Sequence, residues 1–376
     1  MTNGAGLAAA LAAAYPELAD VAAAAPDPVY LVGGAVRDLL LGRGRADIDL
    51  VVEGDPAALA KALGAEPLAA HSRFGTLKVK WGGEELDLAA ARRESYARPG
   101  ALPTVELGAS IRTDLARRDF TVNAMAVPLA EPRELIDPYE GQADLQAGLL
   151  RVIHGRSFVD DPTRAIRAAR YAARFGFDLE PGTEELLRAA DLGTVSPERR
   201  GSELRRLVQE GTGVKGLELL AEWGLGVPAR AERPFALAKA VDQLMAEPPW
   251  SEEVDRSEAI LAAALGPDAG EETLARAHPG RPSEGVALAR GHDPIELVLA
   301  RAAGAEWLDD WLTWREVSLE ITGADLTAAG VTGPAVGRAL EAALCAKLDG
   351  EAPTRADELR IALAASANAP REDTKP

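Results

Sequence analysis

The sequence predicts an α+β protein in which a small mixed β-sheet with helices is followed by an elongated all-helical region. Two observations support this division. Short apolar or alternating runs separated by turn signals fill the first part, whereas Ala/Leu-rich segments with helical periodicity dominate after residue 160. A chain of 376 residues, 47% of them hydrophobic, can form two or more domains or one elongated helical assembly.

Hydrophobic periodicity and turn signals predict the elements of the first part in order. They are a helix over residues 7–24, a strand at Val29–Val32, a helix at Ala35–Leu41, a strand at Asp47–Val52, a helix at Pro56–Leu63, and strands at Thr76–Trp81 and Glu85–Leu88 joined by a Gly82-Gly83 turn. The segment Arg98–Pro103 contains two prolines and a glycine, which predicts a mobile loop.

Helix-start signals mark the second part. Asp160-Asp161-Pro162 predicts a helix with an acidic N-cap and a proline near its first position, and Ser196-Pro197 predicts another. Further helices are expected from residue 211 to about 365, with joins at Pro228, Pro234, Pro248-Pro249, Pro267 and Pro279–Pro282. The polar end, Asn368–Pro376, is expected to be disordered.

Composition indicates a cytoplasmic protein without a membrane partner. The chain has one cysteine, Cys345, so it cannot form an intramolecular disulfide, and a reducing compartment fits. No run of 18 apolar residues occurs, and the Ala-rich segment Gly6–Tyr15 lacks the basic flank of a signal peptide. The net charge of −18 argues against nucleic acid, but residues 151–210 hold eleven arginines against ten acidic residues. A locally basic cleft is therefore compatible with the acidic total.

Two short motifs predict a site for a nucleoside triphosphate with its metal ions. Gly33-Gly34 opens a helix that carries Arg37, and the glycines let backbone N–H groups approach phosphate oxygens. Asp47 and Asp49 lie two residues apart at an apolar strand, so their side chains share one face. Convergent carboxylates are hard oxygen ligands that suit Mg²⁺. Carboxylates at this spacing are also common on solvated surfaces, and it is the glycine motif that favours a site.

Asp87 is a candidate third acidic group. It lies on a strand that could pair near Asp49, although a carboxylate at a strand end in water explains it about as well.

Four motifs in order resemble the class II tRNA nucleotidyltransferase and bacterial poly(A) polymerase family. They are Gly33–Asp38, Asp47–Asp49, Arg117–Ala124 and Asp160–Arg164. The resemblance covers residues 29–210, and the Arg117–Ala124 string is its most specific part. It implies a polymerase β-like nucleotidyltransferase head followed by a helical neck, body and tail. The expected domains are an N-terminal extension (1–28), a catalytic head (29–150), a neck that recognises the base (151–210) and a tRNA-binding body and tail (211–376).

The resemblance also implies an activity and its site residues. Relatives extend the 3′ end of tRNA with nucleotides from CTP and ATP, without a template. Asp47 and Asp49, with Asp87 as a further catalytic candidate, would hold two Mg²⁺ ions that assist nucleotidyl transfer. Gly33, Gly34 and Arg37 would contact the triphosphate, Asp119 the ribose, and Arg118 with Asn123 the sugar-phosphate. No DNA partner is expected.

Base choice would depend on Asp161 and Arg164. A carboxylate accepts from the amino group shared by cytosine and adenine, and a guanidinium donates to their ring acceptors. Uracil and guanine place a carbonyl where the carboxylate wants a donor. Arg167, Arg170 and Arg174 share the helix face of Arg164 and could reach phosphates, and a solvated basic face is the rival interpretation. For the Asp161–Arg164 pair the rival is an N-capped helix with an i,i+3 ion pair.

The motifs leave several activities open. Glu94–Pro103 lies where the family has a flexible loop that couples C to A addition, which favours a full CCA-adding enzyme. Glu198-Arg199 resembles the last family motif, interpreted as support for the neck helices. A-adding, CC-adding and poly(A)-adding enzymes share the scaffold. An RNA-binding protein with an inactive head is disfavoured by the intact acidic residues, and a small-molecule nucleotidyltransferase by the long helical half.

Overall fold

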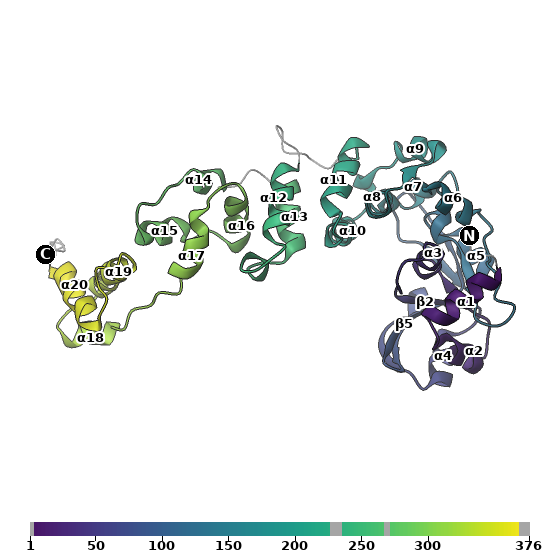
Figure 1. Cartoon of the computed structure of the whole chain (residues 1–376), viewed down its shortest axis with the longest axis horizontal. Coiled ribbons are helices and arrows are strands. Elements are labelled where there is room, and N and C mark those ends of the chain that lie inside the picture. The colour runs from purple at the N-terminus through teal and green to yellow at the C-terminus, as the bar shows by residue number, and fades with distance from the viewer. Residues whose placement is uncertain (1–3, 226–234, 267–270, 368–376) are drawn as a thin grey trace. The chain divides into compact units, whose positions relative to one another are not determined.

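The computed structural model describes residues 4–225, 235–266 and 271–367. The chain divides into two compact units, Met1–Pro228 and Ala229–Pro376, and the α+β fold class is confirmed (Figure 1). The predicted joins at Pro228, Pro234 and Pro267 and the predicted disorder of Asn368–Pro376 lie outside the described residues. The finer domain limits at 28, 150 and 210 stay predictions.

The first unit is built on a six-stranded mixed sheet with the order β3-β4-β5-β2-β1-β8. The strands are β1 (Val29–Val32), β2 (Ile48–Val52), β3 (Glu66–His71), β4 (Thr76–Trp81), β5 (Glu84–Ala90) and β8 (Ala126–Pro128). β2 runs parallel to β5 and antiparallel to β1, so it lies in the middle of the sheet. The sequence predicted β1, β2, β4 and β5 within two residues and missed β3 and β8.

The predicted single helix over residues 7–24 is wrong. The structure has two helices there, α1 (Gly4–Ala14) and α2 (Leu18–Ala24), separated by a break that contains Pro16. Proline lacks the backbone N–H and clashes with the preceding turn, so a continuous helix would be strained there. Among the described residues no single helix is long and apolar enough to cross a membrane, and only this pair, bent by 98°, reaches that length and composition together.

Helices α3 (Gly34–Leu40) and α4 (Pro56–Leu63) pack against the sheet. The predicted boundaries of α4 are confirmed because every end signal is used. Asp55 accepts a hydrogen bond from the N–H of Ala57, Pro56 takes the first position, and Gly64 ends the helix with a φ of +64°. Val51 belongs to a buried cluster with Leu115 of α5 (Ile111–Ala116). Since Asp49 and Val51 share one face of β2, this cluster lies beside the acidic pair.

Short strands and helices complete the first unit. The hairpin of β6 (Arg92–Ser95) and β7 (Thr104–Leu107) carries the predicted loop, and β9 (Leu149–Leu150) pairs with β10 (Asp178–Leu179). The helices that follow are α6 (Gly141–Ala147), α7 (Ser157–Asp160), α8 (Thr163–Phe175), α9 (Pro181–Leu187), α10 (Pro197–Gln209) and α11 (Gly213–Glu222). α8 packs against both α10 and α11.

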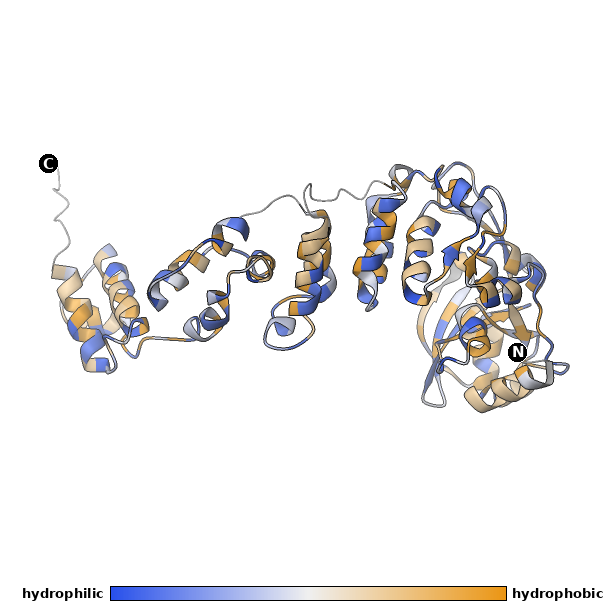
Figure 2. Cartoon of the chain, turned by 45° about the horizontal axis from the view of Figure 1, so that its top comes forward, coloured by the Kyte–Doolittle hydropathy of each residue, from blue (hydrophilic) through white to orange (hydrophobic). Residues whose placement is uncertain are grey.

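The second unit contains no β-strand among its described residues and is built from helices, as predicted. They are α12 (Ala236–Leu244), α13 (Arg256–Leu265), α14 (Glu271–Ala275), α15 (Pro282–Ala289), α16 (Pro294–Ala302), α17 (Trp307–Trp314), α18 (Gly323–Ala328), α19 (Pro334–Leu348) and α20 (Arg355–Ala367). These helices carry both hydrophobic and hydrophilic residues (Figure 2). α18, α19 and α20 share a core cluster that includes Leu326, Ala343 and Ala362.

Candidate active site

One cavity of about 660 Å³ in the first unit gathers the predicted site residues. They are Gly33, Gly34, Arg37, Asp47, Asp49, Arg118, Asp119, Asn123, Asp161, Arg164, Arg167 and Arg170, and only Asp87 lies outside it. The lining comes from the start of α3, the start of β2, the segment after α5, and helices α8 and α10. Glu94, Tyr96, Tyr171, Arg206 and Glu210 also line the cavity and were not predicted as site residues. Glu94 and Tyr96 fall in the segment predicted as a loop, and the other three carry no site motif.

The glycine turn is required by geometry. Gly33 has a φ of +65°, and a Cβ atom placed there would lie 2.8 Å from Nη1 of Arg118. Glycine therefore allows both the left-handed backbone and the close approach of the guanidinium. On the helix that follows, Arg37 is buried and donates through Nη1 to Oδ1 of Asn123 at 2.6 Å. The guanidinium also lies 4.4 Å from the centre of the Phe175 ring, so Arg37 is held from two sides.

Asp47 and Asp49 line the cavity, and Asp87 lies beside Asp49 outside it; among the described residues these carboxylates do not form a group of three that could hold a metal ion together. Asp49 lies in β2 directly opposite Asp87 of the parallel strand β5, so the predicted proximity of the two is confirmed. Burial, followed by the charges of Asp87 and Asp47, raises the pKa of Asp49 to about 6, against the opposing effects of Arg118 and Lys78. Burial also raises the pKa of Asp87. These hard oxygen donors with limited positive compensation fit a divalent cation such as Mg²⁺.

Asp119 lines the cavity and is held by several donors. Its Oδ1 accepts hydrogen bonds from the N–H of Phe120 at 2.8 Å and from Asn123 at 3.1 Å, and Arg167 donates to its Oδ2 at 2.8 Å. Burial acts to raise the pKa of this carboxyl, but Arg167 and Asn123 outweigh it and hold the pKa at about 2. Asp119 is therefore ionised at neutral pH, and it fixes both Asn123 and Arg167.

Asp161 and Arg164 line the cavity but do not pair with each other. Arg164 donates to Oγ of Ser157 and to the carbonyl of Arg117, each at 2.6 Å, whereas Asp161 pairs with Arg199 at 3.0 Å. The rival interpretation of a local i,i+3 ion pair is therefore wrong. Asp161 and Pro162 lie between α7 and α8, and Asp161 accepts a hydrogen bond from the N–H of Thr163 at the start of α8. The predicted helix start is thus preceded by one short helix, α7.

The basic side chains of α8 line the cavity and differ in exposure, since the Arg174 side chain is 41% exposed. Arg164 is 5% exposed, and the Arg170 side chain is 15% exposed. Oε1 of Glu210 lies 3.7 Å from Nε of Arg170 and 3.5 Å from Nη1 of Arg174. Nε of Arg170 and Oε2 of Glu210 are buried without a hydrogen-bond partner. Arg174 and Arg170 therefore sit where an anion could replace the carboxylate.

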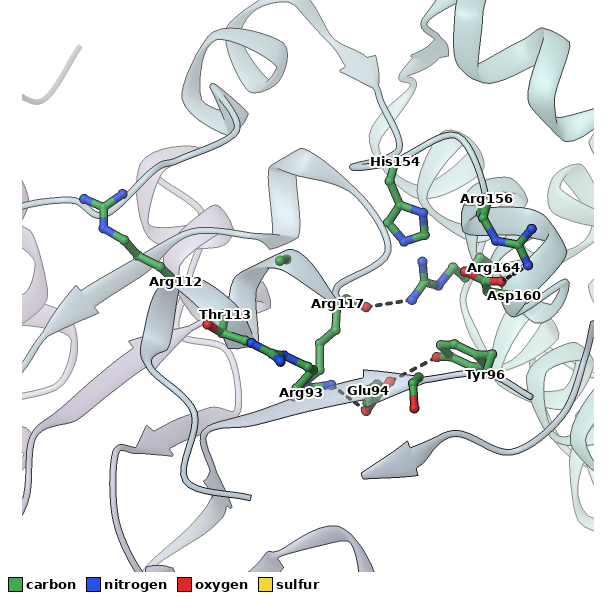
Figure 3. Close-up of a pocket in the computed structure, with 12 residues that line it drawn as sticks. Arg93, Glu94, Tyr96, Arg112, Thr113, Arg117, His154, Arg156, Asp160 and Arg164 are labelled. Carbon is green, nitrogen blue, oxygen red and sulfur yellow. Dashed lines mark hydrogen bonds and ion pairs between the residues drawn. The ribbon is translucent and has the colours of Figure 1, made fainter. Parts of the chain in front are cut away.

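A second cavity of about 600 Å³ shares a wall with the first (Figure 3). Glu94, Tyr96, Arg117 and Arg164 line both cavities. Burial, followed by the charge of Glu94, raises the pKa of the Tyr96 phenol, which stays protonated and donates to Glu94 at 3.0 Å. Glu94 also accepts from Arg117 at 3.1 Å. The base of the β6–β7 loop is thereby tied to the segment that carries Arg118.

The chain is similar to several known proteins. A model of the poly A polymerase head domain matches residues 29–151. A CC-adding tRNA nucleotidyltransferase of Deinococcus radiodurans is 37% identical over 362 residues, which cover 91% of this chain and 90% of that protein. The chain belongs to the tRNA nucleotidyltransferase family. Nucleotidyltransferases of this kind generally use divalent metal ions.

Other relatives differ in length and printed activity. An A-adding tRNA nucleotidyltransferase of Halalkalibacterium halodurans is 40% identical over 252 residues, covering 62% of this chain and 58% of the relative. The chain spans about half the length, or less, of the A-adding relatives first matched, at 58%, 24% and 45%. Among solved structures, the apo form II of a CCA-adding enzyme matches with a TM-score of 0.81 and 27% identity, covering 95% of this chain and 98% of that one. A CCA-adding enzyme of Thermotoga maritima complexed with tRNA matches with a TM-score of 0.68 and 28% identity over 93% of each chain.

Proposed function

We propose that this chain adds C and A nucleotides from CTP and ATP to the 3′ end of tRNA, completing or repairing the CCA end. The observation that carries the proposal is a single cavity that combines the glycine turn, Asp47 and Asp49, and the pair Asp161 and Arg164. Structures of similar enzymes are described with ATP, CTP and tRNA, which supports these ligands as substrates. The acidic chain would act in the cytoplasm.

In the proposed reaction the 3′-hydroxyl oxygen of the RNA attacks the α-phosphorus of the nucleotide, and pyrophosphate leaves. Asp47 and Asp49 would hold two Mg²⁺ ions, with Asp87 beside them, and bound metal would favour the attacking hydroxyl and neutralise the leaving group. The N–H groups of the Gly33-Gly34 turn and the guanidiniums of Arg37, Arg170 and Arg174 suit the triphosphate oxygens. The protein's contribution is positioning and charge neutralisation.

Asp119, Asn123 and Arg118 are proposed to contact the sugar and its phosphate. Asp119 receives three donor groups and retains lone-pair capacity for a ribose hydroxyl, since an ionised carboxylate has about four acceptor sites. Nε of Arg118 is buried without a hydrogen-bond partner. Because an unsatisfied buried donor is costly, a ligand oxygen at that position would bind favourably. Arg167, fixed by Asp119, would lie beside them.

Base selection is proposed to rest on Asp161 and Arg164. Arg164 uses two of its N–H groups on Ser157 and Arg117, and so keeps donors for the ring acceptors of cytosine and adenine. The carboxylate of Asp161 would accept from the amino group that both bases share. Uracil and guanine would place a carbonyl oxygen against this carboxylate, which disfavours them.

A-adding and CC-adding activities on the same scaffold are the second candidates, because relatives with each of these printed names match the chain. The helices after residue 211 are proposed to bind tRNA away from its 3′ end, since the match to a tRNA complex covers 93% of this chain. Their phosphate contacts would make tRNA binding weaken as salt rises.

Primer extension on three tRNA transcripts, ending before CCA, after C and after CC, tests the proposal. Addition of C, C and one A, with no further growth, establishes the CCA-adding function. Addition of A alone to the CC-ended transcript, or of C alone up to that point, establishes one of the second candidates. Long A tracts indicate a poly(A) polymerase. Absence of product with folded protein and Mg²⁺ would contradict enzymatic function and favour an RNA-binding protein.

A further inference from the structure

We propose that Arg199 is a positioning residue for nucleotide selection, which holds the carboxylate of Asp161 in one orientation and ties it to the β6–β7 loop. This inference rests on the proposed function of Asp161 in base recognition. Arg199 lies in the first turn of α10, whose N-cap Ser196 accepts a hydrogen bond from the Arg199 N–H. Its side chain does not line the cavity, whereas Asp161 does, so Arg199 would act through Asp161.

The first contact orients the carboxylate. Oδ1 of Asp161 accepts from Nη2 of Arg199 at 3.0 Å, from the N–H of Thr163 at 3.1 Å and from Oγ1 of Thr163 at 2.7 Å. Among the described residues, no hydrogen bond or ion pair reaches Oδ2. One oxygen is thus saturated, and the other stays available to an amino donor in the cavity. A carboxylate presented through a single free oxygen is a directional acceptor, which selection between an amino group and a carbonyl requires.

The second contact reaches the loop. Nη1 of Arg199 donates to the carbonyl oxygen of Gly100 at 2.8 Å. Gly100 has a φ of +66°, and a Cβ atom there would lie 2.6 Å from the carbonyl oxygen of Thr194. The loop backbone therefore packs directly against the segment before α10. The Arg199 guanidinium thus joins the carboxylate of Asp161 to Gly100 in the loop, and these two residues are 61 positions apart in sequence.

The side-chain chemistry explains why this position is an arginine. The planar guanidinium presents parallel donors that satisfy two acceptors in fixed geometry, whereas a lysine ammonium is a point charge on a flexible stem. The Arg199 side chain keeps 25% and that of Asp161 19% of its exposure, so the pair is only partly screened. Loss of a hydrogen bond to a charged group, transmitted to selection, corresponds to roughly a 10- to 100-fold loss.

The test compares Arg199→Ala, Arg199→Lys and Gly100→Ala with the wild type and with Arg205→Ala. Arg205 is an exposed arginine on the same helix that lies outside the cavity and makes no described ion pair, so its replacement is the matched control. The selection ratio is kcat/KM for the nucleotide that the wild type adds divided by kcat/KM for the nucleotide that carries a carbonyl in place of the amino group. The pairs are CTP with UTP, and ATP with GTP. Hydrogen exchange of the amides in residues 96–103 is followed in parallel.

We expect Arg199→Ala to lower this selection ratio about tenfold or more, mainly through kcat/KM for the correct nucleotide, and to speed exchange in the loop. Arg199→Lys should keep more of the selection ratio than Arg199→Ala does. Gly100→Ala should speed hydrogen exchange in the loop and lower the selection ratio less than Arg199→Ala does. Arg205→Ala should match the wild type. An Arg199→Ala protein with wild-type selection and loop exchange would overturn the inference, even if it were less stable. If the wild type added no nucleotide, the proposed function would fail, and unchanged loop exchange would separately refute the tether.

Discussion

The ion pair of Asp119 and Arg167 should contribute measurably to the stability of the first unit. The pKa of Asp119 is about 2, against an ordinary value of 3.8. Since one pKa unit corresponds to about 1.4 kcal/mol, the folded environment favours the ionised carboxyl by about 2–3 kcal/mol. Asp119→Asn removes this charge and deprives Arg167, 27% of whose side chain is exposed, of its nearest acidic partner, leaving Glu203 at 3.8 Å. We expect the free energy of unfolding to fall by about 2–3 kcal/mol, below the range for fully buried pairs because Arg167 keeps some water.

A double-mutant cycle isolates the pairwise energy. Arg167→Met and the double variant complete the cycle, and a coupling energy of about 2 kcal/mol is expected for charges in direct contact. Hydrogen exchange of the α8 amides at several urea concentrations reports the unit that contains the pair. The amides of α19 in the second unit serve as the internal control, because the change should not affect them. A coupling energy below about 0.5 kcal/mol, the usual limit of additivity, would refute the reasoning.

The pH dependence of this stabilisation has a defined sign. Because the pKa of Asp119 is lower in the folded protein than in the unfolded chain, its contribution is complete above about pH 5 and is lost as the pH falls through about 2. The difference in stability between wild type and Asp119→Asn should therefore be equal at pH 5 and pH 7. A difference that shrinks between pH 7 and pH 5 would show that another group controls it.

Three further outcomes follow from the structure. Gly33→Ala should lower kcat/KM at least tenfold, because its Cβ would meet a guanidinium nitrogen at 2.8 Å, whereas Gly42→Ala, with a φ of +64° but open space around it, should share the backbone strain and keep activity. Asp49→Ala should abolish nucleotide addition and leave the circular dichroism spectrum unchanged. Glu106→Ala, which removes an exposed carboxylate, is the control and should stay active. Glu358→Ala should lower the free energy of unfolding of the second unit by about 2–4 kcal/mol, measured by urea unfolding. The reason is that the buried Glu358 carboxylate accepts hydrogen bonds from two backbone N–H groups and from a lysine. A decrease under about 1 kcal/mol would contradict this.

Local signals predicted elements whose ends are determined by their own residues. The helix Pro56–Leu63 was predicted with its observed limits because its cap, proline and terminal glycine are all adjacent in sequence. The strand Thr76–Trp81 was predicted because it alternates and is followed by a Gly82-Gly83 turn. Strands such as β6, Arg92–Ser95, were missed because four polar residues carry no period, and their stability comes from pairing with β7.

In the candidate site, too, the sequence predicted features that depend on neighbouring residues and did not predict contacts between distant segments. The motifs predicted most of the residues that line the cavity. They did not predict the partners, since Asp161 pairs with Arg199 across 38 positions instead of with Arg164 three positions away. A sequence window cannot weigh these two partners, because the choice depends on how α10 packs against α8. The supporting residues Glu94 and Glu210 were missed for the same reason.

The partners of the arginines explain how an acidic chain can hold a cavity suited to anions. Each guanidinium of the cavity must stay in place before any ligand binds, and an unpaired cluster of like charges would repel. Glu94, Asp114, Asp119 and Glu210 each accept from or pair with at least one arginine near the cavity. These carboxylates are paired with arginines beside the cavity. The net charge of the whole chain therefore does not describe the charge that a ligand meets in the cavity. Asp49 differs, because its neighbours include two further carboxylates and its pKa rises to about 6. The charge balance is therefore incomplete at the acidic pair, the position where a bound cation would stabilise the site.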